Sequence, residues 1–136
     1  MREIKFRGKR TDNGEWVEGF LIGLYNPQIK ENVIKQSFIH NGTIFYNHDK
    51  VIPETVGQFT GLTDKNGKEI YEGDICKVLY SSIGFQIDVM GVVYWGDWSM
   101  SYQIYLLPNQ DEYKLADYKS DIEVIGNIHD NHELLK

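Results

Sequence analysis

Three Asn-Gly dipeptides, each between short runs of β-forming residues, constrain the fold of this chain more than any other feature of its sequence. Asn-Gly tolerates the positive φ angles of the tightest hairpin turns, so each pair predicts two antiparallel strands joined by a short turn. The pairs are Asn13-Gly14, Asn41-Gly42 and Asn66-Gly67. Together with an opening strand in which Ile4 and Phe6 alternate with basic residues, the flanking runs predict strands at 15–22, 37–40, 43–46, 56–60 and 69–71.

Apolar runs in the second half of the chain predict four more strands, at 75–80, 87–95, 102–107 and 122–128. Alternation in the last strand places Ile122, Val124 and Gly126 on one face. It places Glu123, Ile125 and Asn127 on the other face. Helical periodicity does not extend beyond single turns at 113–118 and 132–135. Thirteen glycines favour bulges and bends. We therefore predict a mainly β fold, either a small antiparallel β-barrel or paired sheets, with short helical turns only.

The length and composition predict one domain over residues 1–136, within which 24–50 forms a loop or a sub-lobe. A chain of 136 residues with 41% hydrophobic residues can fill one core. Its single cysteine, Cys76, cannot form an internal disulfide, and no apolar run approaches the ~20 residues that span a bilayer. These features predict a cytoplasmic protein with no membrane contact.

The charge is unevenly distributed. The net charge is −6, and the acidic pI of about 5.1 argues against general nucleic-acid binding. The first ten residues nevertheless carry a local +4, which leaves −10 on residues 11–136. Two interpretations remain open: a basic arm that contacts phosphate or an acidic partner, or the solvent face of a first strand. The basic residues are Arg2, Lys5, Arg7, Lys9 and Arg10.

Common catalytic motifs are absent from the sequence. It contains no Gly-x-Ser-x-Gly elbow, no Gly-x-x-x-x-Gly-Lys phosphate loop and no Cys-x-x-Cys pair. His129 and His132 are spaced to share a metal ion, but nothing in the spacing supplies two further ligands, and solvent-exposed tail histidines are the alternative. We therefore assign no catalytic residue, no metal ligand and no cofactor, and favour a protein that is not an enzyme.

The densest acidic cluster allows a chemical and a structural interpretation. Two positioned carboxylates could perform acid and base chemistry or hold a divalent ion. In the structural interpretation, which we favour, the Asp64 side chain caps a turn, Gly67 takes the left-handed position, and Gly73 bends the chain into the next strand. The cluster consists of Asp64, Glu69, Glu72 and Asp74.

An aromatic cluster at 94–102 is the candidate interaction surface. Trp95 and Trp98 flank a Gly-Asp turn and cannot both point into one small core, so at least one is expected to be exposed. Exposed Trp and Tyr are enriched at protein interfaces, whereas a base-stacking groove normally includes Lys or Arg, which residues 78–113 lack. The alternative is a hairpin whose aromatics close the end of a barrel. The candidate residues are Tyr94, Trp95, Trp98 and Tyr102.

Three segments resemble the YopX family of phage and prophage proteins. They are residues 2–8 (REIKFRG), 57–75 (GQFTGLTDKNGKEIYEGDI) and 124–135 (VIGNIHDNHELL). The resemblance implies a small, mostly β protein encoded in mobile genetic elements of bacteria, with no established activity or catalytic residues to carry over. Residues 71–75 also look like the start of a barrel strand in SH3-like domains, which is a likeness of fold alone.

These observations give three hypotheses. The first is a phage-encoded accessory module without catalysis, which binds a protein partner or forms a homo-oligomer. The second is a nucleic-acid-associated module that uses the basic first strand. The third is a metal-dependent hydrolase that uses the acidic cluster or the terminal histidines, and it requires those groups to converge.

Overall fold

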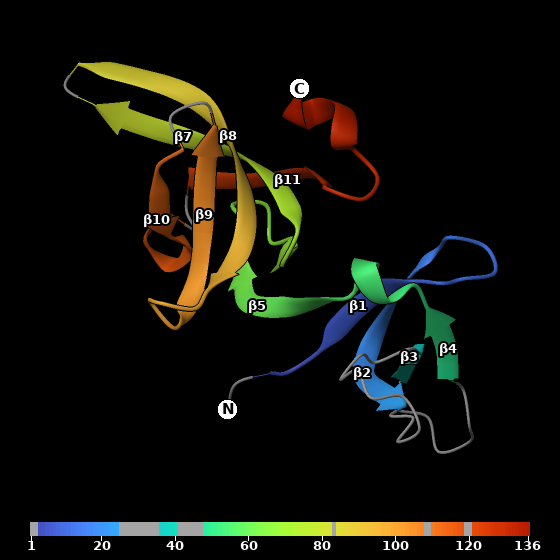
Figure 1. Ribbon diagram of the computed structural model, residues 1–136. Helices are drawn as coiled ribbons and strands as arrows, with labels where there is room; N and C mark the ends of the chain where they lie inside the picture. The colour runs from blue at the N-terminus through green and yellow to red at the C-terminus, as the bar shows by residue number, and fades with distance from the viewer. Residues whose placement is uncertain (1–2, 25–35, 41–47, 83, 108–109, 119–120) are drawn as a thin grey trace. The chain divides into compact units, whose positions relative to one another are not determined.

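The computed structural model describes residues 3–24, 36–40, 48–82, 84–107, 110–118 and 121–136. The chain divides into two compact units, residues 1–59 and 60–136. Most of the segment 24–50, predicted as a loop or sub-lobe, and the predicted Asn41-Gly42 turn lie outside the described residues. Antiparallel strands and isolated 3₁₀ turns make up both units (Figure 1), in agreement with the predicted mainly β fold.

The first unit is an antiparallel sheet in the order β4-β3-β2-β1, with the start of β5 beside β1. Its hairpin turn is the one that Asn13-Gly14 predicts: Gly14 has a φ of +70°, and Lys9 and Trp16 are the last pair before the turn. The elements are β1 (Phe6–Lys9), β2 (Trp16–Leu24), β3 (Gln36–His40), β4 (His48–Val51), the 3₁₀ turn Pro53–Thr55 and the first residues of β5 (Gly57–Thr63).

Gly8 has a packing role in β1. A Cβ atom at this position would lie 2.9 Å from Val51 Cβ, closer than real side chains approach. Val51 is 1% exposed, so it has no room to move aside. The missing side chain at Gly8 therefore allows Val51 to pack directly against the first strand.

The second unit holds a five-stranded antiparallel sheet in the order β10-β9-β8-β7-β11, and the end of β5 together with β6. Among the described residues the strands form two antiparallel sheets that are not closed, so the mainly β prediction is confirmed and the barrel alternative is wrong. The elements are β6 (Glu69–Tyr71), β7 (Asp74–Ser82), β8 (Phe85–Gly96), β9 (Ser101–Leu107), β10 (Glu112–Lys114), β11 (Ile122–Asn127) and the 3₁₀ turns Leu115–Asp117 and His132–Leu135.

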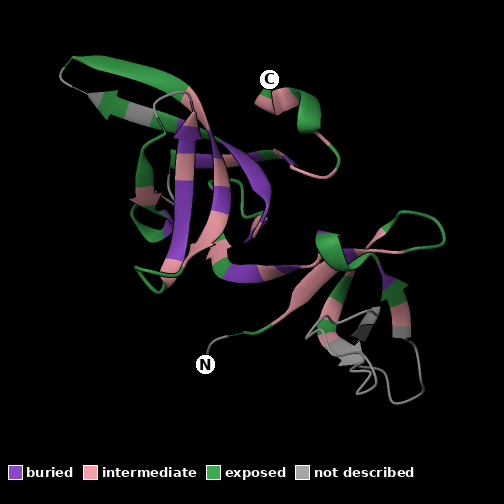
Figure 2. Ribbon diagram, in the orientation of Figure 1, coloured by how far each residue is buried: buried purple, intermediate pink, exposed green. Residues whose placement is uncertain are grey.

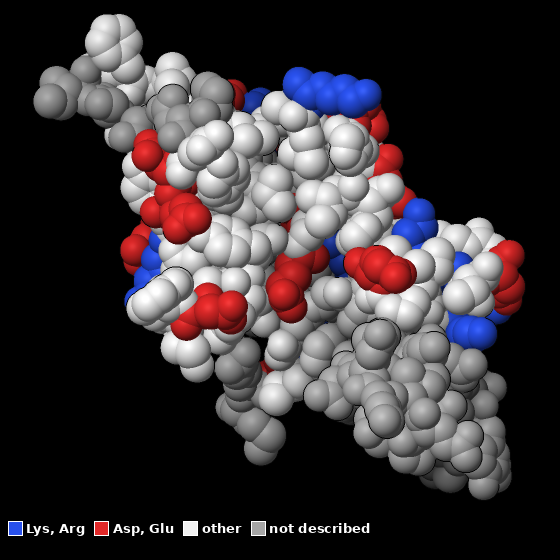
Figure 3. All heavy atoms as spheres, viewed as in Figure 1, with Lys and Arg blue, Asp and Glu red and all other residues white. Residues whose placement is uncertain are grey.

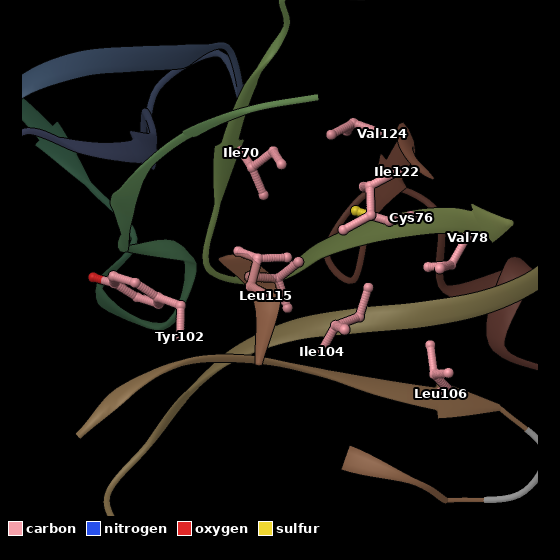
Figure 4. Close-up of a cluster of buried hydrophobic side chains, with 10 residues drawn as sticks. Ile70, Cys76, Val78, Tyr102, Ile104, Leu106, Leu115, Ile122 and Val124 are labelled. Carbon is pink, nitrogen blue, oxygen red and sulfur yellow. The ribbon is translucent and has the colours of Figure 1, made fainter. Parts of the chain in front are cut away.

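A core of ten buried side chains stabilises the second unit. Burying one Ile, Leu or Val stabilises a protein by about 1.5–3 kcal/mol relative to leaving it exposed. The buried stretches of β7 and β9 line this core (Figure 2), and the side chains converge from several strands (Figure 4). They belong to Ile70, Cys76, Val78, Val93, Tyr102, Ile104, Leu106, Leu115, Ile122 and Val124.

Strands β7 and β8 continue beyond β9 as a two-stranded ribbon (Figure 1). Strand β8 pairs with β9 only from Met90 onward, whereas its pairing with β7 starts at Phe85. Alternation places Phe85 and Ile87 on the face of Val89, which packs against the core. Phe85 and Ile87 are 74% and 54% exposed, so the apolar face of the sheet extends past the part that the core covers.

Strand β11 differs from the predicted alternation at its end. The register with β7 shifts between Val124 and Gly126, which is the signature of a β-bulge. Ile122 and Val124 lie on the same face as predicted, and that face is the core, but Ile125 is 38% exposed and Asn127 is buried. The faces predicted for Gly126 and Asn127 were wrong. The bulge adds one unpaired residue to β11, so the residues after it lie on the opposite face from the one that simple alternation predicts.

Candidate functional site

The aromatic candidate surface lies at the turn that joins β8 to β9. Gly96 pairs with Ser101, and residues 97–100 form the turn between them. Trp98 is 102% exposed, so its whole ring stands in solvent, and Met100 beside it is 72% exposed. The sequence-based expectation that at least one tryptophan is exposed is therefore confirmed.

Trp95 and Tyr102 belong to the interior more than to the surface. They are a cross-strand pair, and their rings meet edge to face with centroids 4.9 Å apart. Tyr102 is 9% exposed and lies at one end of the core, with its hydroxyl directed away from the other labelled side chains (Figure 4). Of the four predicted surface residues, Tyr102 is thus a core residue, and Trp95 packs against that core.

A hollow of about 320 Å³ opens beside the exposed Trp98. Gly96 makes room for it, because a Cβ atom there would lie 2.6 Å from Ser99 Oγ and 2.8 Å from Gln103 Cγ. Its walls combine three aromatic rings with two carboxylates. The lining residues are Tyr94, Trp95, Gly96, Asp97, Trp98, Ser99, Gln103 and Glu112.

Hydrogen bonds fix the polar walls of this hollow. Gln103 is buried, and its Nε2 donates to Ser99 Oγ at 3.0 Å and to Ser101 Oγ at 2.8 Å. Burial raises the pKa of the Tyr94 phenol, and its hydrogen bond to the Glu112 carboxylate raises it further. Tyr94 therefore stays protonated as a donor to Glu112 throughout the physiological pH range.

The basic residues of the first strand contact groups of their own unit. Lys5 Nζ lies 5.1 Å from the ring centre of Phe59, and Arg7 lies 4.7 Å from that of Trp16. Lys9 Nζ also lies over Trp16, at 5.8 Å. Arg10 donates to the Asp12 carboxylate at 2.6 Å. Arg2 lies outside the described residues.

On the face drawn in Figure 3, basic and acidic side chains are interspersed, and the described basic residues do not form a continuous patch. The interpretation of these residues as the side of a first strand agrees with their placement in and beside β1. Phosphate contact by this strand stays a prediction.

The acidic cluster supports turns. Asp64 Oδ1 accepts hydrogen bonds from the backbone N–H groups of Asn66 and Lys68, at 2.8 and 2.9 Å. Its Oδ2 accepts a third from the N–H of Val124 in β11, at 2.9 Å. Burial acts to raise the pKa of this carboxyl, but the three N–H groups outweigh burial and hold the pKa below its ordinary value. Gly67 takes a φ of +80°, so the structural interpretation of this turn is confirmed.

The other acidic residues of the cluster have local contacts as well. Asp74 is 1% exposed and its Oδ2 accepts from the N–H of Tyr71 at 2.8 Å. Glu69 Oε2 accepts from the Tyr71 hydroxyl at 3.1 Å. Within the described part of the chain, no three His, Cys, Asp or Glu side chains are arranged to hold a metal ion.

The closing segment, with His129 and His132, folds around Asn127. The Asn127 Oδ1 accepts from the N–H groups of His129 and Asp130, at 3.0 and 2.9 Å. Asn131 Oδ1 accepts from the N–H of Asn127 at 3.2 Å. This side-chain network explains why the segment turns sharply after β11. His129 lies in that turn, and His132 begins the 3₁₀ turn that follows it.

The central and closing segments that carry the family resemblance meet in the second unit. Gly73 O accepts from the N–H of Ile128 at 2.9 Å, and Asp74 pairs with Asn127 in the sheet. With the bond from Val124 to Asp64, these contacts join two segments about 60 residues apart in sequence. The resemblance therefore lies largely in residues that build the fold.

Two features of the surface were not predicted. The buried Gln103 looks like an ordinary strand residue in sequence, and only its two serine partners show why it is tolerated there. The apolar ribbon end was predicted only in part, because the predicted strand began at Ile87 and left Phe85 outside it, whereas β8 begins at Phe85. Strand length alone also does not show where a neighbouring strand stops.

The helical turns described are all too short to cross a membrane.

Comparisons with known proteins agree with this fold. The crystal structure of protein EF1440 from Enterococcus faecalis is similar to the chain at 26% sequence identity, with a TM-score of 0.58 over 100% of both chains. No curated protein matches the sequence. The sequence pattern of the YopX protein family matches residues 5–136, nearly the whole chain. The chain therefore belongs to the YopX protein family.

Proposed function

We propose that this chain is a non-catalytic accessory module of a mobile genetic element, and that it binds a protein through the β8–β9 turn. The single observation that supports the proposal most strongly is the complete exposure of Trp98. A tryptophan ring buries a large apolar area on binding and loses little conformational entropy, so it is a common anchor of protein interfaces. Turns usually carry small polar residues, which makes an exposed Trp and Met in one turn unusual.

The local charge supports a protein partner over nucleic acid. Residues 78–113 contain no Lys or Arg, whereas phosphate backbones are bound by basic side chains. The hollow beside Trp98 also contains two carboxylates, which would repel phosphate. The partner is another protein or a second copy of this chain.

The test compares the wild type with Trp98→Ala, a substitution that removes no buried contact. Sedimentation at high protein concentration measures self-association, and affinity capture from a bacterial lysate measures partner binding. We expect Trp98→Ala to reduce whichever association is found by at least tenfold, because central aromatic residues contribute about 2 kcal/mol or more.

Phe85→Ala is the matched control, since Phe85 is also exposed but lies at the other end of β8. It should leave association unchanged. The proposal would be contradicted by two results together: a wild type that is monomeric, and a wild type that captures no protein that Trp98→Ala fails to capture. Trp95→Ala is less suitable, because Trp95 packs on Tyr102 and its loss would disturb the core.

A further inference from the structure

Around the hollow, the N–H donors of Gln103 already form hydrogen bonds within the chain, whereas the oxygen acceptors of Gln103 and Asp97 can still accept hydrogen bonds. Both N–H bonds of the Gln103 amide are donated to the serine hydroxyls, which leaves Oε1 of this buried side chain as the group with unused capacity. Asp97 forms no hydrogen bond or ion pair with the described residues, and its carboxylate offers only acceptors. The hollow therefore presents carboxylate and amide oxygens next to aromatic rings.

The first unit shows how this protein covers a tryptophan elsewhere. Arg7 and Lys9 both lie over the ring of Trp16, within about 6 Å of its centre. Aromatic faces attract cations through the negative potential above the ring, and the planar Arg guanidinium also stacks on them. Trp98 has no Lys or Arg within 15 positions of it in sequence. Lys114 in β10 pairs with Gln103, but it is not among the lining residues of the hollow, which include no basic residue.

We infer that this hollow binds a lysine or arginine side chain that a protein partner inserts against Trp98. The inference rests on the proposed function and names the chemistry of the partner at the same site. The cation lies against the aromatic rings and donates hydrogen bonds to Asp97 and to Gln103 Oε1. Glu112 adds a second negative charge while it accepts from Tyr94.

Other classes of ligand fit this hollow less well. An anion would face Asp97 and Glu112, and the like charges would repel it. An apolar side chain would remove water from both carboxylates without replacing the lost hydrogen bonds. A cationic side chain alone satisfies the carboxylates, the amide oxygen and the aromatic faces together.

Short capped peptides test this inference without the natural partner. The probes are acetyl-Gly-Arg-Gly-amide, its lysine counterpart and its citrulline counterpart, which has nearly the shape of arginine without the charge. Two-dimensional proton–nitrogen NMR spectra follow the indole N–H signals of the three tryptophans. Trp16 is an internal reference, because its ring already carries two cations of its own chain.

We expect the arginine and lysine peptides to shift the Trp98 and Trp95 signals with a dissociation constant on the order of 1 mM, and to leave Trp16 unchanged. The citrulline peptide should cause no shift. Binding should weaken with salt, because the carboxylates are exposed. The ratio of the two dissociation constants shows whether the site prefers the planar guanidinium or the ammonium group.

Asp97→Asn should weaken binding of the arginine peptide several-fold. Asp111→Asn is its control, since it makes the same change in net charge outside the hollow, and it should have no effect. No shift at about 10 mM peptide, or equal shifts from arginine and citrulline, would overturn the inference. If Trp98→Ala still abolished protein association in that case, the proposed function would stand while the cationic partner would not.

Discussion

The two units of this chain stabilise their aromatic and apolar groups in different ways. In the first unit, Arg7 of β1 lies over the ring of Trp16, and Lys5, just before β1, lies over the ring of Phe59. In the second unit, ten side chains pack into a core that contains no charged residue. A cation over an aromatic ring contributes about 0.5–2 kcal/mol, whereas truncating a buried Ile costs about 2–5 kcal/mol. The difference teaches that one chain can stabilise aromatic rings with basic side chains in one unit and with apolar packing in the other.

The largest expected effect is in the core of the second unit. Ile104→Ala should lower the free energy of unfolding by about 2–5 kcal/mol, because Ile104 is fully buried and its loss leaves a cavity. Ile87→Ala makes the same chemical change at an exposed site and should cost no more than about 0.5 kcal/mol. Urea unfolding measures both. If amide exchange in β1 and β2 accelerates as much as in β7–β9, the two units open together, and the contrast between them is lost.

The next effect concerns Asp64, whose carboxylate joins the β5–β6 turn to β11. Asp64→Asn should cost about 1–3 kcal/mol, because an amide can accept at one side only and its N–H₂ would face the donor of a backbone N–H. Asp111→Asn, at an exposed site, is the control. A loss as small as that of the control would show that the charge and its three hydrogen bonds contribute little to the second unit.

The contribution of Asp64 also depends on pH. Its pKa is lower in the folded state than the ordinary value of 3.8, so its stabilising effect is fully present above that value. The effect is lost as the pH falls through the folded pKa, because the protonated carboxyl is a weaker acceptor. The difference in stability between the wild type and Asp64→Asn should therefore shrink in strong acid, which thermal unfolding at several pH values measures.

The smallest effect is expected in the first unit. Arg7→Ala should lower the stability of the β1–β2 hairpin by about 0.5–1 kcal/mol, through the lost contact with the Trp16 ring. Arg7→Lys keeps a cation near the ring and should retain part of the contact. Trp16 fluorescence and amide exchange of β2 measure the change. A loss of several kcal/mol would mean that Arg7 contributes as much as a core residue, and the contrast between the units would then disappear.

Local sequence signals predicted the turns correctly because each turn is determined by few residues. Gly14 and Gly67 adopt positive φ, each within its own short turn. Asp64 caps the turn that follows it through a hydrogen bond to a residue only four positions away. The extra residue in β11 was not predictable in this way. Whether Asn127 points inward depends on its pairing with Asp74 of β7, more than 50 positions away.

The aromatic surface was predicted in part for the same reason. Sequence indicated that Trp95 and Trp98 could not share one core, and Trp98 is exposed. Sequence did not indicate that Tyr102 is buried, because its face is set by its register with Trp95 across the hairpin. The hollow requires residues from three strands, so it exists only once β8, β9 and β10 are paired.

The buried Cys76 makes the second unit a reporter of its own opening. Its side chain is 0% exposed within the core, and the chain contains no other cysteine. A thiol reagent can therefore modify this protein only when the second unit opens, and the rate of labelling measures how often that happens. Mass spectrometry of the wild type gives this rate without any substitution, and a bound partner that holds the unit closed should slow it.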